Sequence, residues 1–185
     1  MTEIPKYEPT VEYSPGDPWT IVRFMLMQHK RVLVPLMSDY HFFFSESLMG
    51  YLLVQGEPKK LKQYLLDFFI PATVIFDTFT MKPVIIPDVK AQRYKVAVDD
   101  PYNDIKILSH SLEYYAGNRN RLVCVCGPLI GLTGYVVRFH RSRRFVFSLE
   151  GNITCSSSNI KQSAFMTLAE YTALPLSQKN PAIDL

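Results

Sequence analysis

The segment from Arg121 to Ile160 constrains the fold of this chain more than any other stretch. It contains three runs rich in β-branched and aromatic residues: Leu122 to Cys126, Tyr135 to Phe139 and Phe145 to Leu149. Short turn-forming segments separate the runs, which is typical of consecutive antiparallel strands. The segment therefore predicts half of a small β-barrel.

The connection between the first two runs contains the glycines Gly127, Gly131 and Gly134, and Pro128 follows the first of them. Glycine can adopt a positive φ or allow a neighbouring backbone to come close, and proline restricts its own φ. The spacing therefore favours a loop of fixed conformation over a flexible one.

Positive charge is concentrated in the second hairpin, which contains His140 and the arginines Arg138, Arg141, Arg143 and Arg144. Such charges are tolerated where water or an anion contacts them. Two interpretations remain open: a solvated hairpin tip, or a surface that contacts nucleic-acid phosphates or an acidic protein face. The four arginines are the candidate nucleic-acid-binding residues of this hairpin.

Composition limits the class of protein. Of the 185 residues, 48% are hydrophobic and 20% are charged, which excludes a disordered chain and allows one good core or two small ones. Residues 1–104 hold 11 Lys and Arg and 13 Asp and Glu, a net charge of −2, whereas residues 105–185 hold 9 and 4, a net charge of +5. No apolar run approaches about 18 residues, and the first ten residues lack a signal-peptide core. We therefore expect a cytoplasmic protein without membrane contact.

The chain has no motif for catalysis: neither a Gly-x-Ser-x-Gly elbow, nor a phosphate-binding loop, nor His-Glu-x-x-His is present. The histidines are far apart, and the acidic stretch at 99–104 fits no cation-binding loop. Cys124 and Cys126 alternate along a strand, so we expect both on one face as small buried residues rather than as metal ligands. We expect no enzymatic activity, no cofactor and no metal.

The first part of the chain predicts a strand and a helix. After a proline-rich extended leader, residues 1–18, the run from Trp19 to Phe24 is typical of a strand. Residues 25–36 have near-helical apolar spacing, but Pro35 lacks a backbone donor and crowds the preceding turn. We therefore expect this helix to stop or kink near Val34.

Two further strands are predicted, a buried one at Tyr40 to Phe44 and another at Leu48 to Val54. A helix beginning near Pro58 and closed by Pro71 has apolar residues at the i, i+3, i+4, i+7 and i+8 positions of an amphipathic helix. These residues are Leu61, Tyr64, Leu65, Phe68 and Phe69. This helix is expected to pack on the sheet.

Short strands follow at Val74 to Phe76 and Val84 to Ile86, and Pro87-Asp88 is typical of a helix start. Near the end of the chain, Phe165, Leu168 and Ala169 have helical spacing. The order of strands and helices favours an α+β arrangement in which helices cover an antiparallel sheet.

Several segments together resemble the NusG family of transcription elongation factors. Trp19-Thr20-Ile21-Val22-Arg23 matches the Trp-Tyr-x-x-x strand that opens the NGN domain, Gly50-Tyr51-Leu52-Leu53-Val54 matches its Gly-Tyr-x-x-Val strand, and Lys82 to Asp88 matches its Pro-x-x-Ile-Pro-Asp segment. The run Gly127-Pro128-Leu129-x-Gly131-x-x-Gly134-x-Val136 resembles the KOW motif, and RRFVFSLEGN followed by SSSN resembles the NusG-like antiterminators of the UpxY type. The resemblance covers residues 18 to 162 in the family's order.

This resemblance implies an α+β protein with an N-terminal NGN-like α/β sandwich, built on an antiparallel sheet, and a small SH3-like KOW β-barrel. The expected parts are a leader at 1–18, the NGN-like domain at 19–100, a linker at 101–114, the KOW β-barrel at 115–162, and a C-terminal helix and tail at 163–185. Gly127, Gly131 and Gly134 would be the structural glycines of the KOW domain.

The resemblance also implies a monomeric elongation or antitermination factor that binds RNA polymerase and suppresses pausing or termination. An apolar depression on the NGN-like sheet would accept the clamp helices of the largest polymerase subunit. The alternative is that the apolar residues of this sheet only pack within the domain. The expected polymerase-binding residues are Trp19, Leu48, Met49, Tyr51, Phe76 and Phe79.

In specialised members of the family, a helix at this position reads the non-template DNA strand. The resemblance therefore implies a DNA-binding role for Gln28, His29, Lys30 and Arg31, and the alternative is that they form an ordinary polar helix face. The KOW domain would contact nascent RNA, a ribosomal protein or Rho. A second hypothesis is a KOW-type RNA-binding or ribosome-associated module without polymerase contact. A third is a structural interaction protein.

Overall fold

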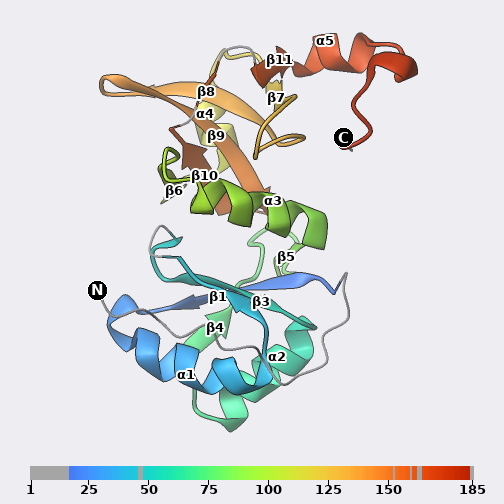
Figure 1. The fold of residues 1–185 in the computed structure, drawn as a ribbon. Coiled ribbons are helices and arrows are strands. Elements are labelled where there is room, and N and C mark those ends of the chain that lie inside the picture. The colour runs from blue at the N-terminus through green and yellow to red at the C-terminus, as the bar shows by residue number, and fades with distance from the viewer. Residues whose placement is uncertain (1–16, 46–47, 152, 159, 162–163, 184–185) are drawn as a thin grey trace. The chain divides into compact units, whose positions relative to one another are not determined.

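The computed structural model of the chain describes residues 17–45, 48–151, 153–158, 160–161 and 164–183. These residues form two compact units, of which the first ends at Asp88 and the second begins at Val89. Each unit combines helices with an antiparallel sheet, so the predicted α+β class is confirmed (Figure 1). The predicted leader lies outside the described residues except for Asp17 and Pro18.

The first unit has the element order β-α-β-β-α-β, followed by one more short strand. Its elements are β1 (Trp19–Phe24), the 3-10 helix η1 (Leu26–Gln28), α1 (His29–Asp39), β2 (Phe42–Phe43), β3 (Tyr51–Gln55), α2 (Pro58–Asp67), β4 (Ala72–Val74) and β5 (Ile85–Ile86). The strands are antiparallel in the order β2-β3-β1-β4, and β5 also pairs with β1. This order is that of a ferredoxin-like double βαβ unit.

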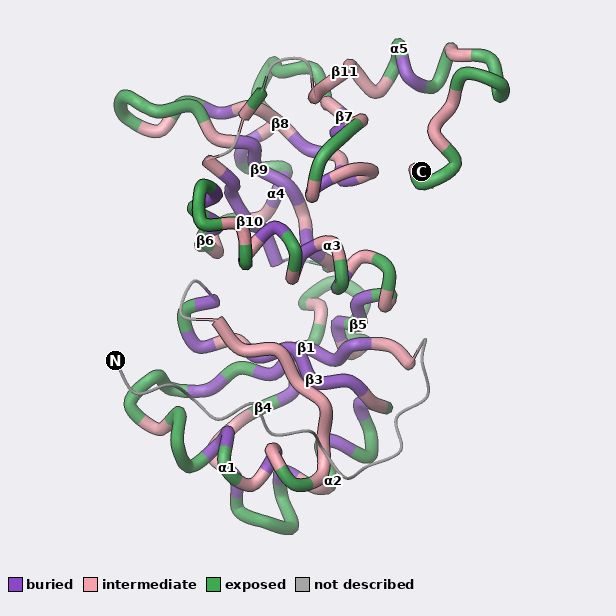
Figure 2. The backbone as a smooth tube through the Cα atoms, viewed as in Figure 1, coloured by how far each residue is buried: buried purple, intermediate pink, exposed green. Residues whose placement is uncertain are grey.

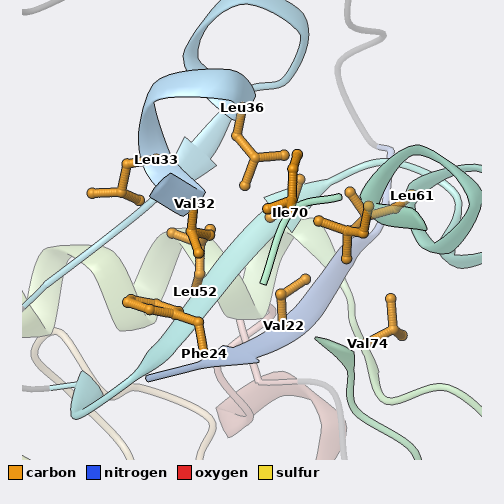
Figure 3. Packing of buried hydrophobic residues seen from close by; sticks show 11 residues of the cluster. Val22, Phe24, Val32, Leu33, Leu36, Leu52, Leu61, Ile70 and Val74 are labelled. Atoms are coloured by element: carbon orange, nitrogen blue, oxygen red, sulfur yellow. The ribbon is translucent and has the colours of Figure 1, made fainter. Parts of the chain in front are cut away.

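Helices α1 and α2 cover one face of this sheet (Figures 1 and 3). Val32, Leu33 and Leu36 of α1 point toward the sheet, because their spacing places them on one side of the helix. Leu61 and Leu65 of α2 complete the layer. The sheet contributes alternate residues of its strands: Val22, Phe24, Leu52, Val54 and Val74. The amphipathic pattern predicted for α2 is therefore confirmed over its first two turns.

Of the two outcomes expected near Val34, a stop or a kink, the stop does not occur, because the helix continues through Pro35 to Asp39. Leu33 before the proline and Leu36 after it are both buried in the core. Burial of these side chains stabilises the helix on both sides of Pro35, and this tertiary contribution outweighs the local cost of the missing backbone donor.

Three other predicted boundaries in this unit are wrong. β2 is only two residues long and half-buried, whereas a buried strand was expected at Tyr40 to Phe44. β3 begins at Tyr51 rather than Leu48, since Met49 and Gly50 adopt positive φ and form a turn. Helix α2 ends at Asp67, and the next two phenylalanines, expected on its buried face, are exposed.

The second unit has one six-stranded antiparallel sheet in the order β11-β7-β8-β9-β10-β6. Its elements are α3 (Asp88–Asp99, which begins at the last residue of the first unit), β6 (Ile105–Leu108), α4 (Leu112–Ala116), β7 (Leu122–Cys124), β8 (Thr133–Phe139), β9 (Ser142–Glu150), β10 (Ile153–Ser157), β11 (Phe165–Thr167), α5 (Leu168–Ala173) and the 3-10 helix η4 (Leu176–Gln178). The three consecutive antiparallel strands predicted from Arg121 onward are confirmed as β7, β8 and β9.

The glycine-spaced connection between β7 and β8 has a defined conformation. Gly127 and Gly131 have φ values of 84° and 82°, a region that favours glycine. Gly134 lies in β8, where an added Cβ would be 1.9 Å from the carbonyl oxygen of Val146 on β9. A side chain at position 134 would therefore separate the two strands.

Helix α4 packs on β8 and β9 and completes a small core. Leu112 and Tyr115 of the helix contact Val137 and Val146 of the strands. Phe139 and Leu108 lie at the edge of this cluster, where they are half-buried. This edge adjoins the candidate site described below.

Residues 101–114, expected to form a linker, instead contain β6 and the start of α4. β6 pairs with β10, and Ile105 is buried, so the alternating apolar residues of this segment form a strand. In the region expected to form a C-terminal helix, Phe165 lies in β11, which pairs with β7, and α5 begins only at Leu168. Residues 162 and 163 lie outside the described residues.

Candidate functional site

Four exposed apolar side chains gather at one end of the first sheet. Met25, Leu26 and Met27 follow β1 directly, and Met49 lies in the turn before β3. A backbone hydrogen bond of 2.8 Å joins the end of β1 to this turn. Met27 and Met49 expose 81% and 61% of their surface. We call these four residues the methionine patch; methionine side chains adapt readily to a partner surface.

The backbone beneath the methionine patch is well defined. The N–H of Gln28 donates to the carbonyl oxygen of Met25 over 2.8 Å, which closes the turn of η1. Gly50 has a φ of 90°, and a Cβ at this position would lie 2.6 Å from the carbonyl oxygen of Phe24. The turn therefore requires glycine, and the patch is held on a fixed backbone.

The other predicted polymerase-binding residues are placed differently. Tyr51 is half-buried beside the patch, with the guanidinium of Arg23 6.0 Å from the centre of its ring. Trp19 and Leu48 are fully buried, and the Trp19 Nε1–H donates to Asp88 Oδ1 over 2.7 Å. Of these three residues, only Tyr51 has side-chain surface exposed in the structure.

Phe76 and Phe79 lie on a separate loop, between β4 and β5. The Oδ1 atom of Asp77 accepts hydrogen bonds from the backbone N–H groups of Phe79 and Thr80, at 3.0 and 2.7 Å. These bonds outweigh a slight desolvation and lower the pKa of Asp77 below its usual value. Phe79 is 89% exposed at the tip of this ordered loop. The six predicted residues are therefore not brought together: two are buried, Met49 and Tyr51 lie at the methionine patch, and the two phenylalanines lie on this loop.

Gln28, His29, Lys30 and Arg31 lie at the junction of η1 and the first turn of α1. They follow the methionine patch directly, and His29 Nδ1 is 3.0 Å from the carbonyl oxygen of Leu26. The three cationic or titratable residues of this set are exposed. The structure therefore places a polar helix start next to an apolar surface.

In the second unit, the hairpin of β8 and β9 carries a concentrated positive charge. Arg138 and Arg143 are directly opposite each other, and His140, with a φ of 51°, forms the two-residue turn with Arg141. The three arginines are exposed, and Figure 2 shows the hairpin tip in green. Within the described residues, no carboxylate pairs with them. Like charges placed opposite each other repel, so this pair favours an anionic contact.

Arg144 differs from the other arginines because its side chain is only 11% exposed. Its Nη1 donates to Asp104 Oδ2 over 3.0 Å, its Nε donates to Ser156 Oγ over 2.9 Å, and its Nη2 donates to the Asp104 carbonyl oxygen. These bonds join β9 to β10 and to the residue before β6. Arg144, predicted to contact nucleic acid, is therefore committed largely to the fold.

A depression of about 530 Å³ lies beside this hairpin. Its lining is Lys106, Leu108, Phe139, His140, Arg141, Ser142, Arg144 and Ser156. The floor is apolar at Leu108 and Phe139, whereas Lys106 and Arg141 supply charge. Sequence analysis did not identify Lys106 as a site residue, because the segment that contains it was expected to be a linker. The one indication of a strand there was that Lys106 lies between two isoleucines, an alternation typical of β6.

The structure separates Cys124 and Cys126 by their burial. β7 ends at Cys124, so Cys124 is buried and Cys126 is exposed, contrary to the expectation that both share one face. Burial raises the pKa of the Cys124 thiol to about 11. Among the described side chains, no group of three or more His, Cys, Asp or Glu residues is arranged to hold a metal ion.

No helix in the described ranges is long and apolar enough to cross a membrane. No family model matches the chain, and neither the curated proteins nor the solved structures contain a match. The exposed apolar and basic side chains define two candidate surfaces. They are the methionine patch in the first unit and the basic hairpin with its depression in the second.

Proposed function

We propose that this chain is a NusG-like transcription elongation or antitermination factor of the UpxY type. Its first unit would be an NGN-like domain that binds the clamp helices of the largest RNA polymerase subunit. Its second unit would be a KOW β-barrel that adds a further contact. Binding would suppress pausing or termination.

The positions of the family-like segments support this proposal. Trp19 opens β1, the central strand of the first sheet, and Gly50-Tyr51 begins the neighbouring β3. Pro87 directly precedes α3, whose first residue is Asp88, and the glycine-spaced segment connects β7 with β8. Each segment thus lies at the kind of element that the resemblance implies for it.

The observation that carries the proposal is the methionine patch beside Tyr51. An amphipathic helix binds where a protein presents preformed apolar surface, and the patch provides exposed methionines on a fixed backbone. It also lies at the start of the Gly-Tyr strand, where the resemblance places polymerase contacts. Leu48 and Trp19 would act indirectly, by supporting this strand from the interior.

The proposed mechanism involves no covalent chemistry. A factor that binds the closed polymerase clamp more tightly than the open one shifts the equilibrium by the difference between the two affinities. A difference of about 1.4 kcal/mol would change the ratio of open to closed clamp tenfold. Modest apolar contacts at the methionine patch would therefore be sufficient to reduce pausing.

Retention of purified core RNA polymerase by the immobilised full-length chain tests the proposal. Met27→Asp with Met49→Asp places two charges in the patch, and we expect polymerase retention to fall at least tenfold. Both side chains are exposed, so folding should be preserved, whereas Leu48→Asp would place a charge in the interior. Phe69→Asp is the matched control, because Phe69 is 88% exposed after the end of α2.

The proposal fails if the wild-type chain does not retain polymerase, or if the double variant retains it as well as wild type does. Failure would favour the alternative, a KOW-type RNA-binding or ribosome-associated module without polymerase contact. The exposed arginines of the β8–β9 hairpin are the observation in favour of that alternative.

A further inference from the structure

We infer that Cys124 and Cys126 form a thiol–disulfide exchange site, at which a low-molecular-weight disulfide oxidises the two thiols to an intramolecular disulfide. The residues that carry this inference line a second depression, which shares no lining residue with the one beside the β8–β9 hairpin. The inference does not depend on polymerase binding, because all of these residues belong to the second unit.

Both cysteines line one depression of about 160 Å³ at the end of β7. Cys126 is exposed and Cys124 is buried, so the depression contains one accessible thiol and one protected thiol. Lys161 is exposed and also lines the depression, where it contributes a positive charge. A small depression with one cation suits a small anionic disulfide such as oxidised glutathione.

The backbone keeps the two cysteines close enough for a disulfide. Residues two positions apart have Cα atoms at most about 7 Å apart, and disulfides join Cα atoms that are about 4.4–6.8 Å apart. The Cys124 thiol already donates to the carbonyl oxygen of Cys126, with the sulfur 3.0 Å from that oxygen. Because Cys126 is exposed, rotation about its χ1 can move its sulfur without displacing packed neighbours.

The backbone beside Cys126 has room for the ring to close. Gly127 has a φ of 84°, and a Cβ built there would meet no atom of the described residues within 4 Å, apart from its chain neighbours. Glycine also has a wider conformational range than any other residue. The small ring of a Cys-x-Cys disulfide is strained, so we expect it to be reduced readily, as an exchange site requires.

Burial determines which thiol reacts first. Burial raises the pKa of the Cys124 thiol to about 11, so this thiol remains protonated near neutral pH. Cys126 therefore attacks the small disulfide: a new S–S bond forms at Cys126, the S–S bond of the reagent breaks, and one reduced thiol leaves with the Cys126 proton. Cys124 then attacks the Cys126 sulfur and releases the second reduced thiol, which takes the Cys124 proton. The two cysteines lose two electrons, and the reagent gains them.

Closing this disulfide affects the pairing of β7 with β11. Cys124 lies opposite Phe165 in that pair, and the Val125 N–H donates to the carbonyl oxygen of Ala164 over 2.7 Å. Val125 lies inside the new ring, so a bend there weakens this hydrogen bond. We expect oxidation to increase amide hydrogen exchange in β11. Unchanged exchange in β11 would contradict the strained ring that the inference requires.

The test incubates the full-length chain, at micromolar concentration and neutral pH, with oxidised glutathione and follows its intact mass. We expect a transient adduct of one glutathione, followed by a product that has lost two hydrogens relative to the reduced chain. The tryptic peptide that begins at Leu122 and ends at Arg138 contains both cysteines, so it should carry this loss. An excess of reduced glutathione should restore the original mass.

Two variants separate the two steps. Cys124→Ala removes the second thiol, so the reaction should stop at the glutathione adduct. Cys126→Ser should react at least tenfold more slowly than wild type, because the two remaining thiols are buried. Cys126 is exposed, so this variant should fold. Cys155 is fully buried and serves as the internal control for folding, because it should remain reduced in the wild type and in both variants.

Three results would overturn the inference. The first is a wild-type chain that stops at the glutathione adduct, which would make Cys126 an isolated exposed thiol. The second is a folded wild-type chain in which Cys126 does not react. The third is a disulfide between two chains as the main product at micromolar concentration, which would show that Cys124 cannot reach the Cys126 sulfur.

Discussion

Arg143 and Arg144 are neighbours in the sequence, but Arg143 is exposed and Arg144 is held by Asp104 and Ser156. Desolvation is the largest single influence on Asp104 and raises its pKa, but the hydrogen bonds and charges of Arg144 and Lys106 together outweigh it, so the net pKa of Asp104 lies below its usual value. A carboxylate with a lowered folded-state pKa stabilises the protein above its unfolded pKa, about 3.9, and this contribution disappears as the pH falls through the folded value. Asp104→Asn should therefore destabilise the chain at pH 7 more than at pH 3.

Urea unfolding of the wild type and of Asp104→Asn at the two pH values measures this difference. Asp99→Asn, at the exposed last residue of α3, is the control and should change stability equally little at both. A loss for Asp104→Asn that is the same at pH 3 and pH 7 would show that the ion pair does not contribute to stability.

At the scale of elements, a hydroxyl group of α2 contacts α1 in addition to the hydrophobic cluster that the two helices share. The Tyr64 hydroxyl of α2 is 3.0 Å from the carbonyl oxygen of Pro35 and 2.6 Å from Asp39 Oδ2. Burial, together with Asp39, raises the pKa of Tyr64 to about 12, so the hydroxyl remains a donor near neutral pH. Tyr64→Phe keeps the ring and removes the donor, and we expect a loss of about 1 kcal/mol in the free energy of unfolding, measured in urea. An unchanged free energy would mean that packing alone holds the two helices.

At the scale of the whole molecule, each unit has a hydrophobic cluster of its own. Leu52→Ala removes a fully buried side chain in the first cluster and Val146→Ala does so in the second, at costs of about 2–5 and 1–3 kcal/mol. We expect amide hydrogen exchange to increase most in the sheet of the altered unit: in β1 and β3 for the first variant, and in β8 and β9 for the second. A larger increase in the other unit would contradict separate cores.

Much of the fold could be predicted because local spacing determines which side chains share a face. The period of α2, the run that forms β1 and the strands β7 to β9 all follow from this rule. The basic hairpin could also be predicted, because its cationic residues lie close together in the sequence. Lys106 could not be predicted as part of this site, because its strand β6 pairs with β10, about 50 residues later in the chain. A short strand with a distant partner is difficult to distinguish from a loop in the sequence alone.

The sequence by itself determined the α+β class, the order of most strands and helices, and the glycines that the β7–β8 connection requires. Only the tertiary structure decided that α1 continues through Pro35, that Trp19 and Leu48 are buried while Met49 is exposed, and that Arg144 pairs with Asp104. The physical reason is that burial and ion pairing depend on residues distant in the sequence. A local sequence pattern does not specify which distant segments pack against a given residue.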